Sequence, residues 1–231
     1  MTAARRRAAD LIAPTRPMTE TPIPKTAKPC AEDYRRQHKL RLEHMPWLYF
    51  SLKAKHQQWA HPWQADLQCK LAALETVQFS EHCFLAPSAT LFAEPGRDII
   101  VGDRSSLAAN CYLHGPIRLG KEVSINPNCR LEGGRAGIVI GDKTRIAAGC
   151  NMYAFNHGLQ ADTPIKDQPV SSKGIRIGQD VWVGANTAIT DGVTVGDHAV
   201  IGINSTVTRD VPAYAIVAGS PARVIGDRRT S

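Results

Sequence analysis

The stretch IGQDVWVGANTAITDGVTVGDHAVIGINSTVTRDVP, residues 177–212, decides the fold because an aliphatic residue recurs in it every six positions. Ile177, Val183 and Ile201 show the repeat, and glycine follows each of them. The same period extends back along the chain to Val101. A period of six fits neither a helix nor a lone strand. It is the signature of a parallel β-helix, in which three short strands and their corners close one coil of about 18 residues.

The repeat also predicts what fills the interior. Each aliphatic side chain should point inward and stack on its counterpart in the next coil, about 4.8 Å away. Glycine beside it suits a tight corner, because glycine adopts positive φ without steric cost. Compact residues recur four positions after the aliphatics, among them Cys111, Cys129 and Cys150. The cysteines form no CxxC pair and lack zinc-like Cys/His spacing, which favours small buried thiols over disulfides or a metal site.

Length and charge limit the function classes. The 231 residues suit one solenoid with appendages, and no apolar run approaches the ~20 residues that span a bilayer. The start, MTAARRRAADLIAP, has the arginines of a secretion signal but no long apolar core, so we expect a cytoplasmic protein. The net charge of +7 comes from the ends, because residues 31–222 hold 19 basic and 18 acidic residues. Without a basic stripe, nucleic-acid binding is not expected.

Two segments precede the repeats. Residues 1–30 are rich in Pro, Thr, Ala and Arg, which is the composition of a disordered tail, and Met18 is an alternative start. Residues 31–80 carry helical periodicity and predict a helical cap. The aromatic residues of this segment could form a membrane-surface patch, but packing of the cap against the open end of the solenoid is favoured. They are Trp47, Tyr49, Phe50, Trp59 and Trp63.

The β-helix itself is predicted over residues 81–226, followed by a short tail at 227–231. A small corner bulge interrupts the repeats at EGGRAG, residues 132–137. A second interruption is a polar insertion at 158–174 that shows no periodicity and follows His157. Long irregular excursions from a regular scaffold are usually functional, so we expect a lid over a substrate.

Residues 85–225 resemble the hexapeptide-repeat acyltransferases, in the branch of the colanic-acid, maltose and galactoside O-acetyltransferases. The most specific parts of the resemblance are the loop at His157, the stretch at 177–212, and VAGSPARVI at 217–225. The resemblance implies an all-β fold, a left-handed parallel β-helix with an N-terminal helical segment, although ordinary crossovers favour the right hand. It also implies a homotrimer, acetyl-CoA as the donor, and no metal.

The family places its catalytic histidine at the root of this loop, which gives His157 the role of general base. A histidine is neutral near pH 7 and can accept the proton of an acceptor hydroxyl. Asn126, in INPNC, matches a family asparagine whose amide can hydrogen-bond the acceptor or the oxyanion. Asparagine is also common at solenoid corners, because it tolerates left-handed backbone. Glu132 is a weaker candidate, and His114 and His198 are expected to be surface residues.

The resemblance also assigns residues to the coenzyme. Trp182 corresponds to a tryptophan beside the thioester arm. Two arginines correspond to basic positions near the nucleotide phosphates, which the forked guanidinium suits, and the remaining positions border the pantetheine groove. The complete set is Trp182, Gly184, Ala185, Gly202, Ile203, Arg209 and Arg223.

The expected function is an acetyl-CoA-dependent O-acetyltransferase that moves the acetyl group directly to a hydroxyl of a sugar or glycan. Three alternatives stay open: an N-acyltransferase on a nucleotide-sugar amine, a γ-type carbonic anhydrase-like enzyme, and a non-catalytic scaffold. The anhydrase would need three converging histidines, but Asp162 stands where a partner of His157 would be.

Counting hexads predicts how the site is divided. If each inward aliphatic starts a face, Asn126 and His157 lie at different corners, roughly 16 Å apart. Trp182 would share the corner of Asn126, two coils on and about 10 Å away. If His157 and Asn126 serve one site, they must therefore come from adjacent chains of a cyclic trimer.

Overall fold

The computed structural model describes residues 30–230. The expected tail at residues 1–30 and the alternative start at Met18 lie outside the described residues, except for Cys30. The chain divides into a short first unit that ends at Arg35 and a second unit that begins at Arg36. The second unit contains the β-helix and nearly all of its helical cap.

The β-helix consists of three sheets, and except for the last two strands of the chain, neighbours in space are three strands apart in the sequence. Sheet A contains β1 (Val77–Phe79), β4 (Ile99–Val101), β7 (Ile117–Leu119), β10 (Ile138–Ile140), β13 (Ile175–Ile177) and β16 (Thr194–Val195). Sheet B contains β2 (Phe84–Leu85), β5 (Ser106–Leu107), β8 (Ser124–Ile125), β11 (Arg145–Ile146), β14 (Trp182–Val183), β17 (Val200–Ile201), β19 (Ala215–Ala218) and β20 (Arg223–Asp227). Sheet C contains β3 (Thr90–Phe92), β6 (Tyr112–His114), β9 (Arg130–Glu132), β12 (Asn151–Tyr153), β15 (Ala188–Thr190) and β18 (Thr206–Val207).

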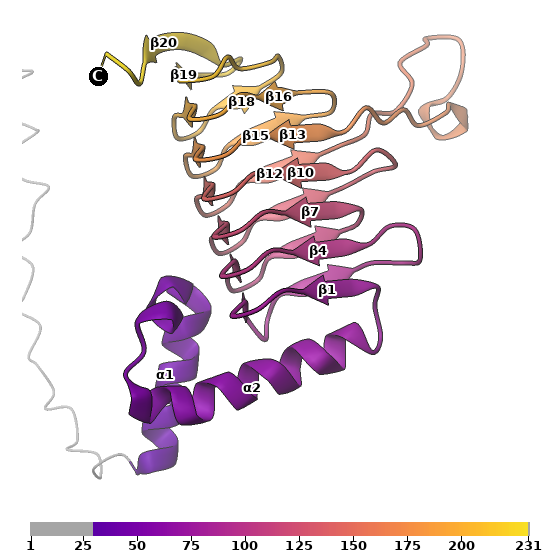
Figure 1. Ribbon diagram of the computed structural model, residues 1–231. Coiled ribbons are helices and arrows are strands. Elements are labelled where there is room, and N and C mark those ends of the chain that lie inside the picture. Colours follow the sequence, from indigo (N-terminus) through magenta and orange to yellow (C-terminus); the bar gives the residue numbers. More distant parts are fainter. Residues whose placement is uncertain (1–29, 231) are drawn as a thin grey trace, which may run out of the picture. The chain divides into compact units, whose positions relative to one another are not determined.

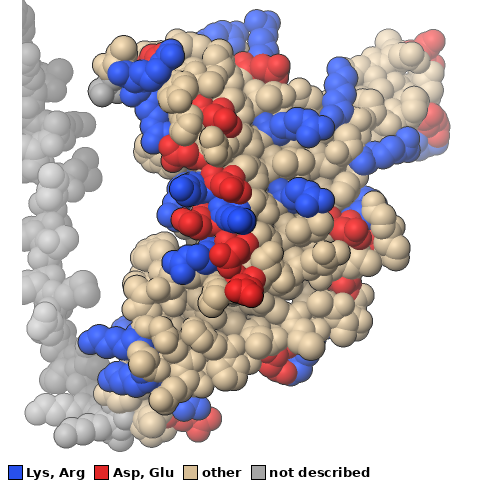
Figure 2. Space-filling model, viewed as in Figure 1, with Lys and Arg blue, Asp and Glu red and all other residues tan. Residues whose placement is uncertain are grey.

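The strands pair in parallel, except for β20, which runs antiparallel to β19. Figure 1 shows the coils stacked one above another, so that the strands of each face form a ladder. This arrangement confirms the expected fold, a left-handed parallel β-helix with an N-terminal helical segment. On the face drawn in Figure 2, basic and acidic side chains are interspersed along one edge of the β-helix.

Stacked aliphatic side chains fill the interior, as the repeat predicts. Val101, Leu119, Ile140 and Ile177 are in register on successive strands of sheet A, and all four are buried. Burying a side chain of this size contributes about 1.5–3 kcal/mol relative to leaving it in water. The repeated column is therefore the main source of stability along the β-helix.

The reason for the glycines differs from the prediction. Gly184 and Gly202, which follow inward aliphatics, do not have positive φ, whereas corner residues such as Asn186 (φ 56°) and Asn204 (φ 57°) do. A Cβ on Gly184 would lie 2.6 Å from the backbone nitrogen of Ile203. Glycine is required there because adjacent coils approach closely, and asparagine supplies the left-handed corner.

The buried thiols are confirmed. Cys111, Cys129 and Cys150 are buried and free, and they stack where sheet B passes into sheet C. Each Sγ donates to a backbone carbonyl oxygen of the next coil, at 3.1–3.2 Å. No group of three or more His, Cys, Asp or Glu side chains within residues 30–230 is placed to hold a metal ion.

The cap comprises α1 (Ala31–His44), the short helix η1 (Pro46–Ser51) and α2 (Ala54–Ala72), and α2 lies across the end of the stack beside β1 (Figure 1). Buried Gln64 of α2 binds both backbone groups of Leu85: Nε2 donates to the carbonyl at 3.0 Å, and Oε1 accepts from the amide at 2.7 Å. The first strand of sheet B is thereby paired by a side chain instead of by another strand, and its edge is closed.

The aromatic residues of the cap agree with the packing interpretation, with one exception. Tyr49 and Trp63 pack on Phe84, which points outward from sheet B in the first coil. Trp47 is the exception, because 52% of it remains exposed. No helix within residues 30–230 is long and apolar enough to cross a bilayer.

Candidate functional site

His157 lies at the root of the long loop, four residues after β12 ends on sheet C. Beside it, Asn156 and Ser171 exchange two backbone hydrogen bonds, at 2.8 and 2.9 Å, and close the base of the loop. The imidazole is exposed and lies 6.1 Å from the Phe155 ring, measured between centroids. Within the described residues no hydrogen bond or ion pair holds this imidazole, so a proton acceptor is available to an incoming molecule.

The loop is not structureless, contrary to the expectation. It contains the short helix η2 (Ile165–Asp167) and is organised around the buried side chain of Gln168. Nε2 of Gln168 donates to the carbonyls of Gln160 and Thr163, at 2.8 and 2.6 Å, and Oε1 accepts from the Gln160 amide at 2.9 Å. One glutamine thus fixes the path of the insertion.

A cavity of about 460 Å³ opens beside the loop, where sheet C meets sheet A. We call it the loop pocket. It is lined by Gly96, Arg97, His114, Glu132, Gly134, Arg135, Phe155, Val170 and Ser172. Glu132, the weaker sequence candidate, therefore faces a pocket that shares Phe155 with the surroundings of His157.

His114 is not the plain surface residue that we expected. Its Nδ1 lies 3.2 Å from Oε2 of Glu132, and its Nε2 lies 3.4 Å from Oε1 of Glu94, so the imidazole bridges two carboxylates. His114 and Glu132 are neighbours because they are in register on β6 and β9. His198 is likewise paired, with Asp180 at 3.0 Å. Both histidines contribute to the solenoid corners instead of standing free.

Asn126 directly follows β8 on sheet B, and its side chain is already partly engaged. The amide Nδ2 donates to the carbonyl of Ile146, one coil on, at 2.9 Å. A primary amide has two N–H donors and one carbonyl acceptor, so one donor and the oxygen remain for a ligand. The bond fixes the direction in which the free groups of Asn126 point.

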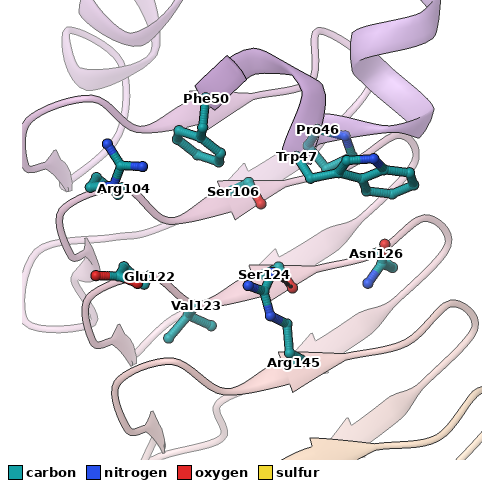
Figure 3. A pocket seen from close by; sticks show the side chains of 10 residues that line it. All are labelled: Pro46, Trp47, Phe50, Arg104, Ser106, Glu122, Val123, Ser124, Asn126 and Arg145. Carbon is teal, nitrogen blue, oxygen red and sulfur yellow. Dashed lines mark hydrogen bonds between the residues drawn. The ribbon is translucent and has the colours of Figure 1, made fainter. Parts of the chain in front are cut away.

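A second cavity, of about 440 Å³, lies between η1 and sheet B, and Figure 3 shows the side chains around it. We call it the cap pocket. Trp47 overhangs the end of the pocket that holds Asn126, and Arg145 reaches over Ser124 (Figure 3). The lining residues are Pro46, Trp47, Phe50, Arg104, Ser106, Glu122, Val123, Ser124, Asn126 and Arg145.

The strand register corrects the count of faces. The inward aliphatics do not start faces, because Leu119 and Ile125 are the last residues of β7 and β8. Trp182 pairs with Arg145, and Arg145 pairs with Ser124, so Trp182 lies in the column of Ser124. Asn126 stands two residues along from that column, so the two residues share sheet B and not one corner.

The candidate coenzyme residues divide between two faces. Trp182, which is 56% exposed, lies on sheet B, where Gly184 stacks on the coil that contains Gly202 through a backbone bond to Ile201 at 2.8 Å. Half-buried Ala185 and exposed Ile203 directly follow these glycines. The exposed Arg223 begins β20 at the end of the same sheet.

Within one chain, Arg209 lies on a different face from the other candidate coenzyme residues. It is exposed and follows β18 on sheet C, a face away from Trp182. His157 and Asn126 also lie apart within one chain, because they stand at opposite ends of sheet C. A face of five extended residues spans roughly 16 Å.

Sequence reasoning missed the side chains that the cap and the register bring to the pockets. Nothing in the sequence indicated that Trp47 and Phe50 would line one cavity with Arg104 and Arg145. His114 and Glu132 did carry a signal, since 18 positions separate them and that spacing is one regular coil.

Comparison with known proteins agrees with this architecture. The sequence profile of the family described as bacterial transferase hexapeptide (six repeats) matches residues 174–209. A probable acetyltransferase of Mycobacterium tuberculosis is 32% identical over 139 residues, which are 60% of this chain and 45% of that protein. The galactoside O-acetyltransferase of Escherichia coli is 39% identical over 88 residues, 38% of this chain and 43% of that protein. The chain thus aligns with less than half the length of either protein.

Two solved structures share the fold. A hexapeptide-repeat acetyltransferase of Vibrio cholerae, complexed with acetyl-CoA, is 25% identical with a TM-score of 0.54, and the match covers 85% of this chain and 89% of that one. AntD, an N-acyltransferase of Bacillus cereus in complex with dTDP and 3-hydroxybutyryl-CoA, is 23% identical with a TM-score of 0.61. That match covers 70% of this chain and 88% of AntD.

Proposed function

We propose that the chain is an acetyl-CoA-dependent acetyltransferase acting on a hydroxyl of a sugar or glycan, on the premise of its similarity to hexapeptide-repeat acetyltransferases. The observation that carries the proposal is the exposed Trp182 beside the closely stacked glycines of sheet B, on the face that also holds Asn126. An exposed indole beside glycines that carry no side chain offers an apolar surface to an extended ligand such as a pantetheine arm.

The reaction needs a base and a donor to the oxyanion. His157 removes the proton of the acceptor hydroxyl, whose oxygen attacks the thioester carbonyl carbon. The free N–H of Asn126 hydrogen-bonds the oxyanion that forms. When the intermediate collapses, the C–S bond breaks and the coenzyme leaves as a thiol, taking up the proton that His157 accepted. The enzyme forms no covalent intermediate.

If His157 and Asn126 serve one site, their separation within a chain means that two chains contribute to that site. In a cyclic trimer the sheet C corner of one chain faces sheet B of the next, because each copy uses two different surfaces for the same ring. The same arrangement brings Arg209 of one chain to Trp182 and Arg223 of its neighbour. The arginines then bind the coenzyme phosphates, while Gly184, Ala185, Gly202 and Ile203 line the pantetheine arm.

The main alternative differs from the proposed function in the acceptor atom, which is a nitrogen instead of an oxygen. An N-acyltransferase that acts on a nucleotide-sugar amine would use the same scaffold and the same donor. Mass spectrometry of the product, with and without alkaline treatment, separates an ester from an amide because only the ester is hydrolysed. A zinc assay on the purified protein tests the anhydrase-like alternative, and absence of coenzyme binding would support a scaffold.

The test of the proposal is consumption of acetyl-CoA with a panel of sugars and glycans, using His157→Asn and a matched control. His82→Asn is the control, because His82 is exposed in the first coil, away from both pockets, and asparagine tolerates its positive φ. Loss of a general base should lower kcat by roughly 10²–10⁴ in His157→Asn only. Activity in His157→Asn equal to that of the control would overturn the role of His157.

A further inference from the structure

The cap pocket contains two arginines that lack an acidic partner. Neither Arg104 nor Arg145 takes part in any ion pair within residues 30–230, although Glu122 lines the same cavity. Arg104 lies over the Phe50 ring at 5.3 Å, and Arg145 donates to Ser124 Oγ at 3.3 Å. Because a guanidinium has five N–H donors, most donors of both groups remain free.

An aromatic wall faces these arginines. The other tryptophans of the cap, Trp59 and Trp63, pack into its apolar cluster, but Trp47 is turned toward the pocket and the end of β8 (Figure 3). An exposed indole in a cavity is well suited to pack against the C–H face of a sugar ring. The cap therefore does more than cover the end of the solenoid, since η1 adds a side wall to sheet B.

The pocket adjoins the face assigned to the coenzyme. Ser106, Ser124, Arg145 and Trp182 follow one another in register on sheet B. Strand spacing places Trp182 about 5 Å beyond Arg145 and about 10 Å beyond Ser124. A ligand in the cap pocket, in contact with Asn126, would thus lie directly below a donor held against Trp182.

We propose that the cap pocket binds the acceptor and selects an anionic saccharide, a sugar that carries a phosphate or a carboxylate group. The identity of this ligand as acceptor rests on the proposed function. Arg104 and Arg145 bind the anion through charge-assisted hydrogen bonds, and the sugar ring packs on Trp47. The carboxylate of Glu122 accepts from ring hydroxyls, and Asn126 faces the hydroxyl that is acetylated.

The test is titration calorimetry in the absence of acetyl-CoA, with glucose 1-phosphate, glucuronate and glucose as probes. Both anionic sugars should bind roughly tenfold or more tightly than glucose at low salt, and the tighter of the two identifies the anion. The double variant Arg104→Gln/Arg145→Gln should lose this preference. Arg118→Gln/Arg176→Gln, two exposed arginines on sheet A, is the matched control and should keep it. Trp47→Ala should weaken binding of all three probes.

Three results would overturn the proposal: equal affinity for the three sugars, no binding of either anionic sugar at millimolar concentration, or an unchanged preference in the double glutamine variant. If that variant has a lowered melting temperature, Arg104→Lys/Arg145→Lys replaces it, because lysine keeps the charge but loses the forked donors. If glucose is acetylated as fast as the anionic sugars, the proposed selectivity is wrong, but the proposed function is still supported. Anion binding without any consumption of acetyl-CoA removes the proposed function and leaves the binding site.

Discussion

Asn126 donates its side-chain amide to the carbonyl of Ile146, one coil away, at 2.9 Å. The bond joins two strands of sheet B and also aims the remaining donor of the amide outward, so a structural contact prepares a candidate catalytic group. We therefore propose two separable roles for Asn126, one structural and one catalytic.

Substitution of Asn126 separates these roles. Asn126→Ala should lower kcat by roughly 10²-fold if the amide stabilises the oxyanion. Asn126→Asp should in addition lower the melting temperature, because a carboxylate opposite the Ile146 carbonyl cannot donate and costs about 1–3 kcal/mol. Steady-state kinetics and thermal unfolding check the two effects. A full kcat in Asn126→Ala would assign the residue to the fold alone.

The Gln64 amide should be the most important single side chain of the cap. Gln64→Leu leaves both the amide and the carbonyl of buried Leu85 without a partner, which should cost about 2–4 kcal/mol of unfolding free energy. Gln57→Leu, which removes one bond to Leu52 within the cap, is the matched control and should cost less than half as much. Urea unfolding measures both. Equal losses would mean that closing the first strand contributes little.

The raised pKa of buried Tyr49 predicts that the protein loses stability at alkaline pH. Burial, and next the charge of the neighbouring Cys83, raises the pKa of Tyr49 to about 12. The unfolded chain loses this proton near pH 10 while the folded chain keeps it, so stability falls as pH rises from about 10 to about 12. Unfolding free energies at pH 9 and 11.5 should differ less in Tyr49→Phe than in the native sequence. An identical difference in both proteins would show that Tyr49 ionises freely.

Substitution of Gln168 should change the loop without destabilising the β-helix. Gln168→Ala removes three hydrogen bonds that fix the insertion, and so should raise KM for the acceptor several-fold while the melting temperature changes little. Gln160→Ala is the matched control, because the Gln160 side chain is exposed and only its backbone bonds Gln168. If Gln168→Ala unfolds at a clearly lower temperature, the loop belongs to the scaffold.

The six-residue period was sufficient to predict the coils but not the phase of the strands within them. Inward stacking of residues such as Ile117 on Ile138 follows from side-chain volume, which the sequence displays directly. The backbone decides where a strand ends, and Leu119 closes β7 because the turn residues after it adopt left-handed φ at Glu122. The counting error for Trp182 has this origin.

The pockets were harder to predict than the coils, because they depend on contacts between distant segments. His114 and Glu132 could be paired from their spacing alone, once a coil length of 18 is assumed. Trp47 could not be placed in this way, since a residue in the short helix η1 has no register with a strand. The cap pocket, where the irregular cap meets the regular β-helix, is therefore the part of this protein that the sequence predicts least well.

The division of the site between chains gives the last prediction. His157→Ala and Asn126→Ala trimers should each be inactive, because in the proposed trimer every site needs the histidine corner of one chain and sheet B of the next. When the two proteins are unfolded and refolded together, each half of a site is intact with a chance of one in two. The refolded mixture should therefore recover roughly a quarter of the native activity, measured as acetyl-CoA consumption, and native mass spectrometry should show mixed assembly. The control mixes His157→Ala with a protein that carries both substitutions; there no intact histidine exists, and activity should stay at zero. Mixed trimers without activity would place both residues in the site of one chain or remove Asn126 from it.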